Sequence, residues 1–96
     1  MMVLITYDVD TTSIAGKKRL RKVAKECVNY GRRVQNSVFE CLLTEAQFCL
    51  LRNKIASHID DELDSIRFYF LGNKWNNRIE YIVKNTTFAI NSELII

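Results

Sequence analysis

The sequence has little of what most zinc and nucleophilic sites require. It contains one histidine, His58, and three cysteines with no C-x-x-C pair. A lone histidine leaves no Ser-His-Asp or Cys-His arrangement to build, which argues against nucleophilic catalysis and against a zinc site. The odd number of unpaired cysteines indicates a reducing compartment, so we interpret Cys27, Cys41 and Cys49 as small core residues.

Long apolar runs are also missing. No stretch approaches the eighteen or so residues of a membrane span, and no basic-then-apolar signal segment opens the chain. We therefore expect a cytoplasmic protein that has no membrane partner. A chain of 96 residues makes one domain near the lower end of what folds alone, so oligomerisation would add stability. A composition with 48% hydrophobic and 26% charged residues excludes disorder.

The formal net charge is only +3, but the charges are segregated along the chain. Residues 11–33 carry eight of the fourteen basic side chains and one acidic side chain, whereas residues 34–66 carry two basic and six acidic side chains. A merely solvated helix face would normally mix both signs. The local excess of positive charge therefore indicates a polyanionic partner, and we favour nucleic acid.

The chain is organised around its first ten residues, which end in two carboxylates. The apolar and β-branched run before Asp8 contains no Gly or Pro and predicts a strand buried on both faces. Alternation along the strand places Asp8 and Asp10 on one face. A carboxylate at this point either caps the following helix or holds a cation, and the residues alone leave both roles open.

Two amphipathic helices are expected. The first covers residues 12–30, with Gly31 just past its end, and buries a stripe of Leu20, Val23, Ala24, Cys27 and Val28. Its other side carries a basic ridge of five residues, namely Lys17, Lys18, Arg21, Lys22 and Lys25. A capping box of Thr44 and Gln47 begins the second helix, which should end near His58 and bury Phe48, Leu51, Ile55 and Ile59.

Short β segments account for much of the rest. Residues 33–43 fit a tight hairpin or a sharply bent strand around residues 35–37. Residues 65–71 alternate as a half-buried strand does, and residues 79–83 predict a further strand. The acidic run at residues 60–64 lacks the spacing of a calcium loop, so we interpret it as a solvated loop. Trp75 lies in a polar segment and suggests contact with a partner.

This order of elements predicts an α+β protein with a ferredoxin-like split β-α-β sandwich and an added C-terminal strand. No helix remains for the second face of the sheet, so we expect a homodimer. The ferredoxin-like domain should cover residues 1–84. Residues 85–96 end in the apolar tail Leu94-Ile95-Ile96 and should form an extension that docks on the partner subunit.

Several segments, in this order, resemble the small Cas-two family of CRISPR adaptation proteins. They are Tyr7-Asp8-Val9, the basic residues 19–25, Gly31 followed by residues 33–40, residues 64–69, and Leu71-Gly72. The joint pattern covers nearly the whole chain. The polar segment around Trp75 is most similar to members attached to type I systems of the C subtype.

The resemblance implies an antiviral role in spacer acquisition, with the Cas-one integrase as partner. Family members are homodimers that exchange C-terminal strands, and each dimer bridges two integrase dimers along incoming DNA. The aspartate that corresponds to Asp8 is the family's Mg²⁺ ligand, one from each subunit; Mn²⁺ is the other divalent ion we consider. Nuclease activity on double-stranded DNA or single-stranded RNA is ascribed to different members. Many relatives carry Asn at the position of Asp10. In this chain, Asp10 adds either a second acidic ligand or a stronger helix cap.

Two functions therefore stay open. The first is a metal-dependent endonuclease with Asp8 as its catalytic metal ligand. The second is a DNA-binding scaffold that acts without cleavage. Nucleic-acid contacts are expected from the basic ridge and, by analogy of position, from three further phosphate-orienting residues: Arg19, Arg33 and Ser37. No general base is evident, so the sequence supports binding better than it supports catalysis.

Overall fold

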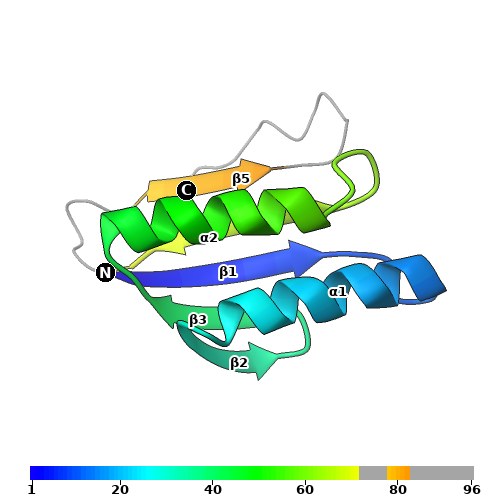
Figure 1. Ribbon diagram of the computed structural model, residues 1–96, viewed down its shortest axis with the longest axis horizontal. Coiled ribbons are helices and arrows are strands. Elements are labelled where there is room, and N and C mark those ends of the chain that lie inside the picture. Colours follow the sequence, from blue (N-terminus) through cyan, green and yellow to red (C-terminus); the bar gives the residue numbers. More distant parts are fainter. Residues whose placement is uncertain (72–77, 83–96) are drawn as a thin grey trace.

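Figure 1 shows the computed structural model, which describes residues 1–71 and 78–82. The described elements are, in chain order, β1 (Met2–Asp8), α1 (Ile14–Cys27), β2 (Gly31–Gln35), β3 (Val38–Leu42), α2 (Glu45–His58), β4 (Ser65–Phe70) and β5 (Arg78–Ile82). Within these residues, no helix is long and apolar enough to cross a membrane. The predicted roles of Trp75 and of residues 85–96 fall outside the described residues.

The strands form one antiparallel sheet in the order β2-β3-β1-β4-β5. β1 lies at the centre and pairs with β3 on one side and β4 on the other. The first four strands and the two helices make the β-α-β-β-α-β arrangement of a ferredoxin-like fold. β5 adds a fifth strand beside β4. The predicted α+β class, the ferredoxin-like order and the extra strand are confirmed.

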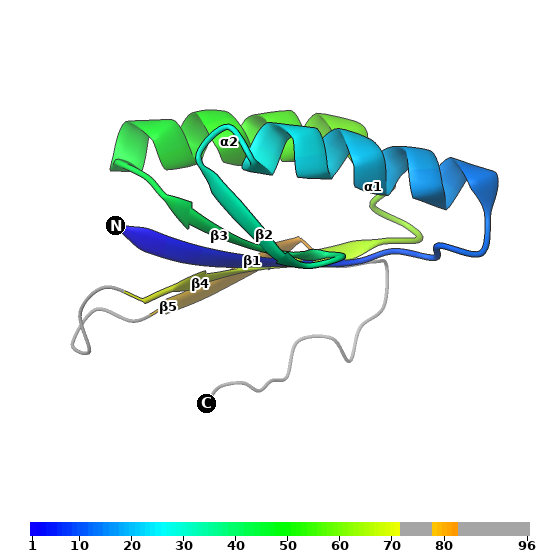
Figure 2. The ribbon, with the colours of Figure 1, turned by 90° about the horizontal axis from the view of Figure 1, so that it is seen from below.

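Both helices cover the same face of the sheet (Figure 2). Val3, Ile5 and Tyr7 of β1 point to this side and are buried, whereas Leu4, Thr6 and Asp8 point to the other face, which we call the helix-free face. The expectation that β1 is buried on both faces is therefore wrong for the described chain. Its even-numbered residues up to Thr6 are half-buried and Asp8 is exposed, because both described helices lie on one side.

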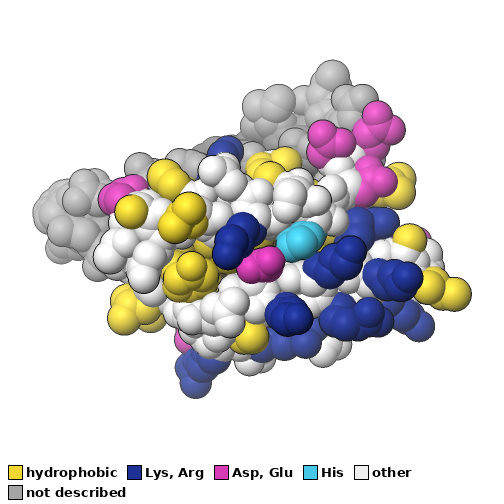
Figure 3. All heavy atoms as spheres, viewed as in Figure 1, with side chains coloured by type: hydrophobic (Ala, Val, Ile, Leu, Met, Phe, Trp, Pro, Cys, Tyr) yellow, Lys and Arg dark blue, Asp and Glu magenta, His cyan; other side chains and the backbone are white. Residues whose placement is uncertain are grey.

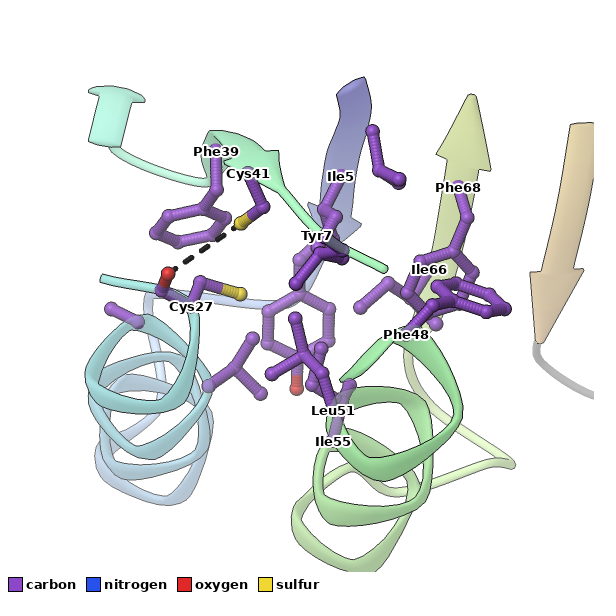
Figure 4. Packing of buried hydrophobic residues seen from close by; sticks show 14 of the residues in the cluster. Ile5, Tyr7, Cys27, Phe39, Cys41, Phe48, Leu51, Ile55, Ile66 and Phe68 are labelled. Carbon is purple, nitrogen blue, oxygen red and sulfur yellow. Dashed lines mark hydrogen bonds between the residues drawn. The ribbon is translucent and has the colours of Figure 1, made fainter. Parts of the chain in front are cut away.

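The core fills the space between the sheet and the two helices (Figure 4). Phe48 of α2 packs edge-on against Phe68 and Phe70 of β4, with ring centroids 5.4 and 4.9 Å apart. The Cys41 thiol donates to the Cys27 carbonyl oxygen at 3.5 Å, so these two cysteines are core residues as predicted. Cys49 is exposed on α2, and its assignment to the core is wrong.

α1 is shorter than the predicted helix at both ends. Ser13 is the N-cap and accepts from the Gly16 N–H at 2.9 Å, and the helix ends at Cys27. Val28 is exposed and leaves the predicted apolar stripe. Gly31 begins β2 instead of following α1 as its C-terminal glycine. A Cβ atom at this position would lie 1.8 Å from the Glu40 carbonyl oxygen, so close approach to β3 requires the glycine.

The remaining elements follow their sequence signals. The Thr44–Gln47 capping box is formed in both directions, and α2 ends at His58 as expected. Residues 31–42 form the β2–β3 hairpin, with a register shift between Arg33 and Gln35. β4 occupies the alternating segment and buries Ile66, Phe68 and Phe70. The sheet thus holds β1 and β4 side by side, and their shared end carries the candidate site.

Candidate metal and nucleic-acid site

Asp8 is the last residue of the central strand. Its side chain is exposed on the helix-free face, in register with Ser65 of β4. A pocket of about 260 Å³ lies at this point and is lined by Thr6, Tyr7, Asp8, Ser37, Ser65 and Arg67. Of the residues predicted to act with Asp8, Ser37 is therefore brought to it, because the Tyr7 N–H donates to the Ser37 carbonyl oxygen at 2.9 Å.

The cap role considered for Asp8 is taken by other residues. Ser13 caps α1, five residues further along the chain. Asp10 closes a small turn, since its Oδ1 accepts from the Thr12 N–H at 2.9 Å and from the Thr12 hydroxyl at 2.5 Å. These bonds lower the pKa of Asp10. Asp10 does not line the Asp8 pocket, so Asp8 is the carboxylate that the described chain presents there.

Oxygen donors surround Asp8, which suits a hard cation such as Mg²⁺. One carboxylate and several hydroxyls are available, and the described residues contain no group of three or more His, Cys, Asp or Glu side chains that would enclose a metal. Mg²⁺ is commonly held by one or two carboxylates, with water at its other positions. The donor set therefore fits a sparse Mg²⁺ site, and a second carboxylate from another chain would complete it.

Arg19 lies apart from this pocket, in a buried network with Asp64 and Tyr7. Its Nε and Nη2 donate to the two Asp64 carboxylate oxygens at 2.8 and 3.1 Å. The Tyr7 hydroxyl also donates to Asp64, and the Asp60 N–H does so at 3.0 Å. Asp64 has no exposed surface. The interpretation of residues 60–64 as a solvated loop is thus wrong at Asp64.

This network shifts three pKa values. Burial acts to raise the pKa of Asp64, but the hydrogen bonds from Arg19, the Asp60 N–H and Tyr7 together hold it below its ordinary value. Burial, together with the neighbouring Asp64 carboxylate, raises the pKa of Tyr7. The hydrogen bond to Asp64 raises the pKa of Arg19. All three groups keep their usual charge at neutral pH, and two Arg19 nitrogens are bound to the protein itself.

The basic ridge lies on the helix side of the molecule. All five of its residues are exposed on α1, and Figure 3 shows basic side chains gathered over this helix. Arg33 also lies apart from Asp8. Its Nε donates to the Asn36 carbonyl oxygen at 2.7 Å, and its guanidinium lies 5.6 Å from the centroid of the Phe39 ring. The sheet therefore separates the ridge from the Asp8 pocket.

Sequence reasoning did not find the β4 side of the pocket. Ser65 and Arg67 come from a segment more than 50 residues after Asp8, and only the β1–β4 register brings them together. The alternation of β4 did place Arg67 opposite the buried face. The predicted ferredoxin-like fold implies that β4 lies beside β1, but the missing information was the register that sets Ser65 opposite Asp8 and Arg67 opposite Thr6.

Known proteins resemble this chain over most of its length. The family model described as CRISPR associated protein Cas2 matches residues 1–79. The chain belongs to the Cas2 family. A relative from Chlorobaculum tepidum, called CRISPR-associated endoribonuclease Cas2, is 56% identical over 84% of both chains. A relative from Halalkalibacterium halodurans, called CRISPR-associated endonuclease Cas2, is 52% identical over 99% of both chains.

A solved Cas2 structure has the same fold. The crystal structure of Streptococcus pyogenes Cas2 at pH 6.5 matches with a TM-score of 0.75 and 60% sequence identity, over 78% of this chain and 90% of that one. This Cas2 chain is therefore CRISPR-associated, as the sequence resemblance implied.

Proposed function

We propose that this Cas2 protein is a divalent-metal-dependent endonuclease of CRISPR spacer acquisition, with Asp8 as the metal ligand. The observation that carries the proposal is the exposed Asp8 carboxylate at the end of the central strand, in a pocket of hydroxyl groups and one arginine. The names of the two relatives, endoribonuclease and endonuclease, agree with a phosphodiester substrate. RNA and duplex DNA are both candidates for it.

A homodimer would supply the second carboxylate. Two copies related by a two-fold axis through the helix-free face would bring two Asp8 side chains together. When bound, Mg²⁺ would lower the pKa of a coordinated water and offset the negative charge of the phosphodiester. The residues of each chain hold and orient the groups: Asp8 offers its carboxylate, and the hydroxyls of Ser37 and Ser65 offer hydrogen bonds. Hydrolysis adds water across one P–O ester bond and leaves a phosphomonoester and an alcohol.

A scaffold function is the second candidate, and one observation favours it. The basic ridge lies on the helix side, whereas Asp8 lies on the helix-free face. A duplex bound along the ridge would thus be held without reaching Asp8 of the same chain. Such a dimer would present DNA to the Cas-one integrase without cleaving it, through phosphate contacts that do not read the sequence.

Asp8→Asn tests the metal site, because it removes the ligand charge and keeps the size of the side chain. We expect Mg²⁺-dependent cleavage of matched single-stranded RNA and duplex DNA to fall at least a hundredfold, while DNA binding is kept. Asp10→Asn is the matched control and should cleave normally, since Asp10 bonds to Thr12 outside the pocket. Cleavage by Asp8→Asn at the wild-type rate would refute the metal site.

Spacer acquisition by the same variant separates the two candidates. If the scaffold function is the one used in the cell, the Asp8→Asn protein still supports acquisition. If it stays dimeric and bound to DNA but does not support acquisition, the scaffold candidate is wrong.

A further inference from the structure

Arg67 is the basic side chain that lines the Asp8 pocket. It lies in register with Thr6, two residues before Asp8, while Ser65 lies in register with Asp8 itself. Side chains alternate along β4, so Ile66 and Phe68 enter the core and Arg67 points to the helix-free face. Arg67 and Asp8 are therefore diagonal neighbours on one face of an antiparallel pair, a relation in which long side chains interact.

The pocket has the chemistry of an oxyanion site beside a carboxylate. An arginine offers a planar fork of N–H donors that matches phosphate geometry, and serine and threonine hydroxyls donate single hydrogen bonds. The volume of about 260 Å³ holds a phosphate group with several waters, since one water occupies about 30 Å³ in the liquid. The Asp8 carboxylate repels a phosphodiester when no cation is bound, and Arg67 adds a fixed positive charge in the same pocket.

We propose that Arg67, assisted by the Ser37 and Ser65 hydroxyls, binds a phosphate of the nucleic acid next to Asp8. The assignment rests on the proposed function and adds the group that holds the substrate there. It differs from the basic ridge in position and in role. The ridge lies across the sheet and binds the backbone at large, whereas Arg67 binds the single phosphate that faces Asp8.

Arg32 supplies a matched control. It is another exposed arginine, on β2 at the far edge of the sheet, and it pairs with Glu40 at 3.0 Å. Arg32→Gln makes the same change in charge as Arg67→Gln but lies outside the Asp8 pocket. The Arg32–Glu40 pair is on the surface and contributes little to stability, and Arg67 is an exposed side chain outside the core, so both variants should fold.

Binding is measured with full-length proteins that also carry Asp8→Asn, so that the probe is not cut. The probe is a short single-stranded RNA at several salt concentrations. Arg67→Gln should lower affinity about tenfold and reduce the salt slope by about 0.7, which corresponds to one phosphate on a single strand. Arg67→Lys should keep the slope and recover only part of the affinity, because lysine keeps the charge and lacks the fork. Arg32→Gln should change neither.

Cleavage is then measured with Asp8 intact. Arg67→Gln should lower the rate at saturating RNA about tenfold or more, and Arg32→Gln should not. Equal slopes, affinities and rates for Arg67→Gln and Arg32→Gln would overturn the assignment even if Asp8→Asn abolishes cleavage. If Asp8→Asn still cleaves, the metal site is wrong, and the slopes on single-stranded DNA of the same sequence decide about Arg67 separately. If Arg67→Gln does not fold, Arg67→Lys decides instead. An RNA affinity and a cleavage rate equal to those of the wild type in Arg67→Lys would overturn the assignment of Arg67.

Discussion

Asp64 shows how much a single residue can connect in this fold. It lies in the turn before β4 and binds Arg19 of α1 and Tyr7 of β1. Tyr7 precedes Asp8, and Asp64 precedes Ser65, so the network adjoins both strands at the end that carries the pocket. A buried carboxylate with this many donors tolerates loss of a partner poorly, because the remaining charge stays buried.

Asp64→Ala should lower the free energy of unfolding by about 3–5 kcal/mol, the usual result of breaking a buried ion pair. The more conservative Asp64→Asn should also change the pH dependence. Because the folded-state pKa of Asp64 lies below the ordinary 3.8, its contribution is complete above that pH and is lost as the pH falls through the folded pKa. Urea unfolding between pH 2 and pH 7 measures both effects. Asp61→Asn changes an exposed neighbour and should leave the loss of stability at low pH as it is in the wild type. If Asp64→Asn also lost stability at low pH as the wild type does, the role assigned to Asp64 would be wrong.

The network also marks a limit of sequence reasoning at this scale. Asp8 could be identified because it ends an apolar strand, and Ser37 because of a family resemblance. Asp64 lies in a run of acidic residues and looks like its exposed neighbours. Its burial depends on Arg19, which is 45 residues away, and no local pattern contains that pairing.

At the scale of elements, α1 has two different sides. Leu20, Val23 and Ala24 face the core, while the basic ridge faces outward. None of the five ridge residues bonds to an acidic side chain in the described part of the chain. A row of cations that is not neutralised by the protein suits a phosphate backbone.

Replacing Lys18, Lys22 and Lys25 by Gln should weaken binding to duplex DNA uniformly across sequences. The slope of log affinity against log salt should become shallower by about 0.9 for each phosphate that the variant no longer neutralises. Lys54→Gln on α2 is the control and should bind as the wild type does. Fluorescence anisotropy at four or more salt concentrations gives the slopes. If the triple variant keeps the wild-type slope, the ridge is only solvated.

Elements with a strong local signal were predicted well, and those fixed by distant contacts were not. The Thr44–Gln47 capping box and the alternation of β4 are local, and both elements appear as expected. The end of α1 was placed too late because Gly31 also suits a helix C-terminus. In the fold it serves the close approach of β2 to Glu40.

At the scale of the whole molecule, the helix-free face has an apolar part at the end of the sheet away from Asp8. Leu42 of β3 is 65% exposed there, in register with the half-buried Met2 and diagonal to the half-buried Leu4 of β1. Together with the small core and the apolar tail of the sequence, this supports a homodimer through the face that carries Asp8.

Leu42→Glu should weaken dimerisation, because it places a charge on the apolar part of this face. Leu50→Glu is the matched control, since Leu50 is 57% exposed on α2 at the other side of the molecule. Deleting residues 85–96 should weaken the dimer as well. Sedimentation over a range of concentrations measures the dissociation constant. A truncated protein and a Leu42→Glu protein that both associate as tightly as the wild type would exclude this interface.

The central position of β1 also affects how the chain folds during synthesis. β1 leaves the ribosome before the other described strands, and one of its two partners, β4, ends about 60 residues later. At about 5–20 residues per second, this interval lasts roughly 3–12 s. During this interval, the edge of β1 that later pairs with β4 has no hydrogen-bonding partner. An apolar strand with an unpaired edge favours aggregation. β3 ends at Leu42 and is complete before β4, so it can pair with one edge of β1, whereas the other edge stays open until β4 is made.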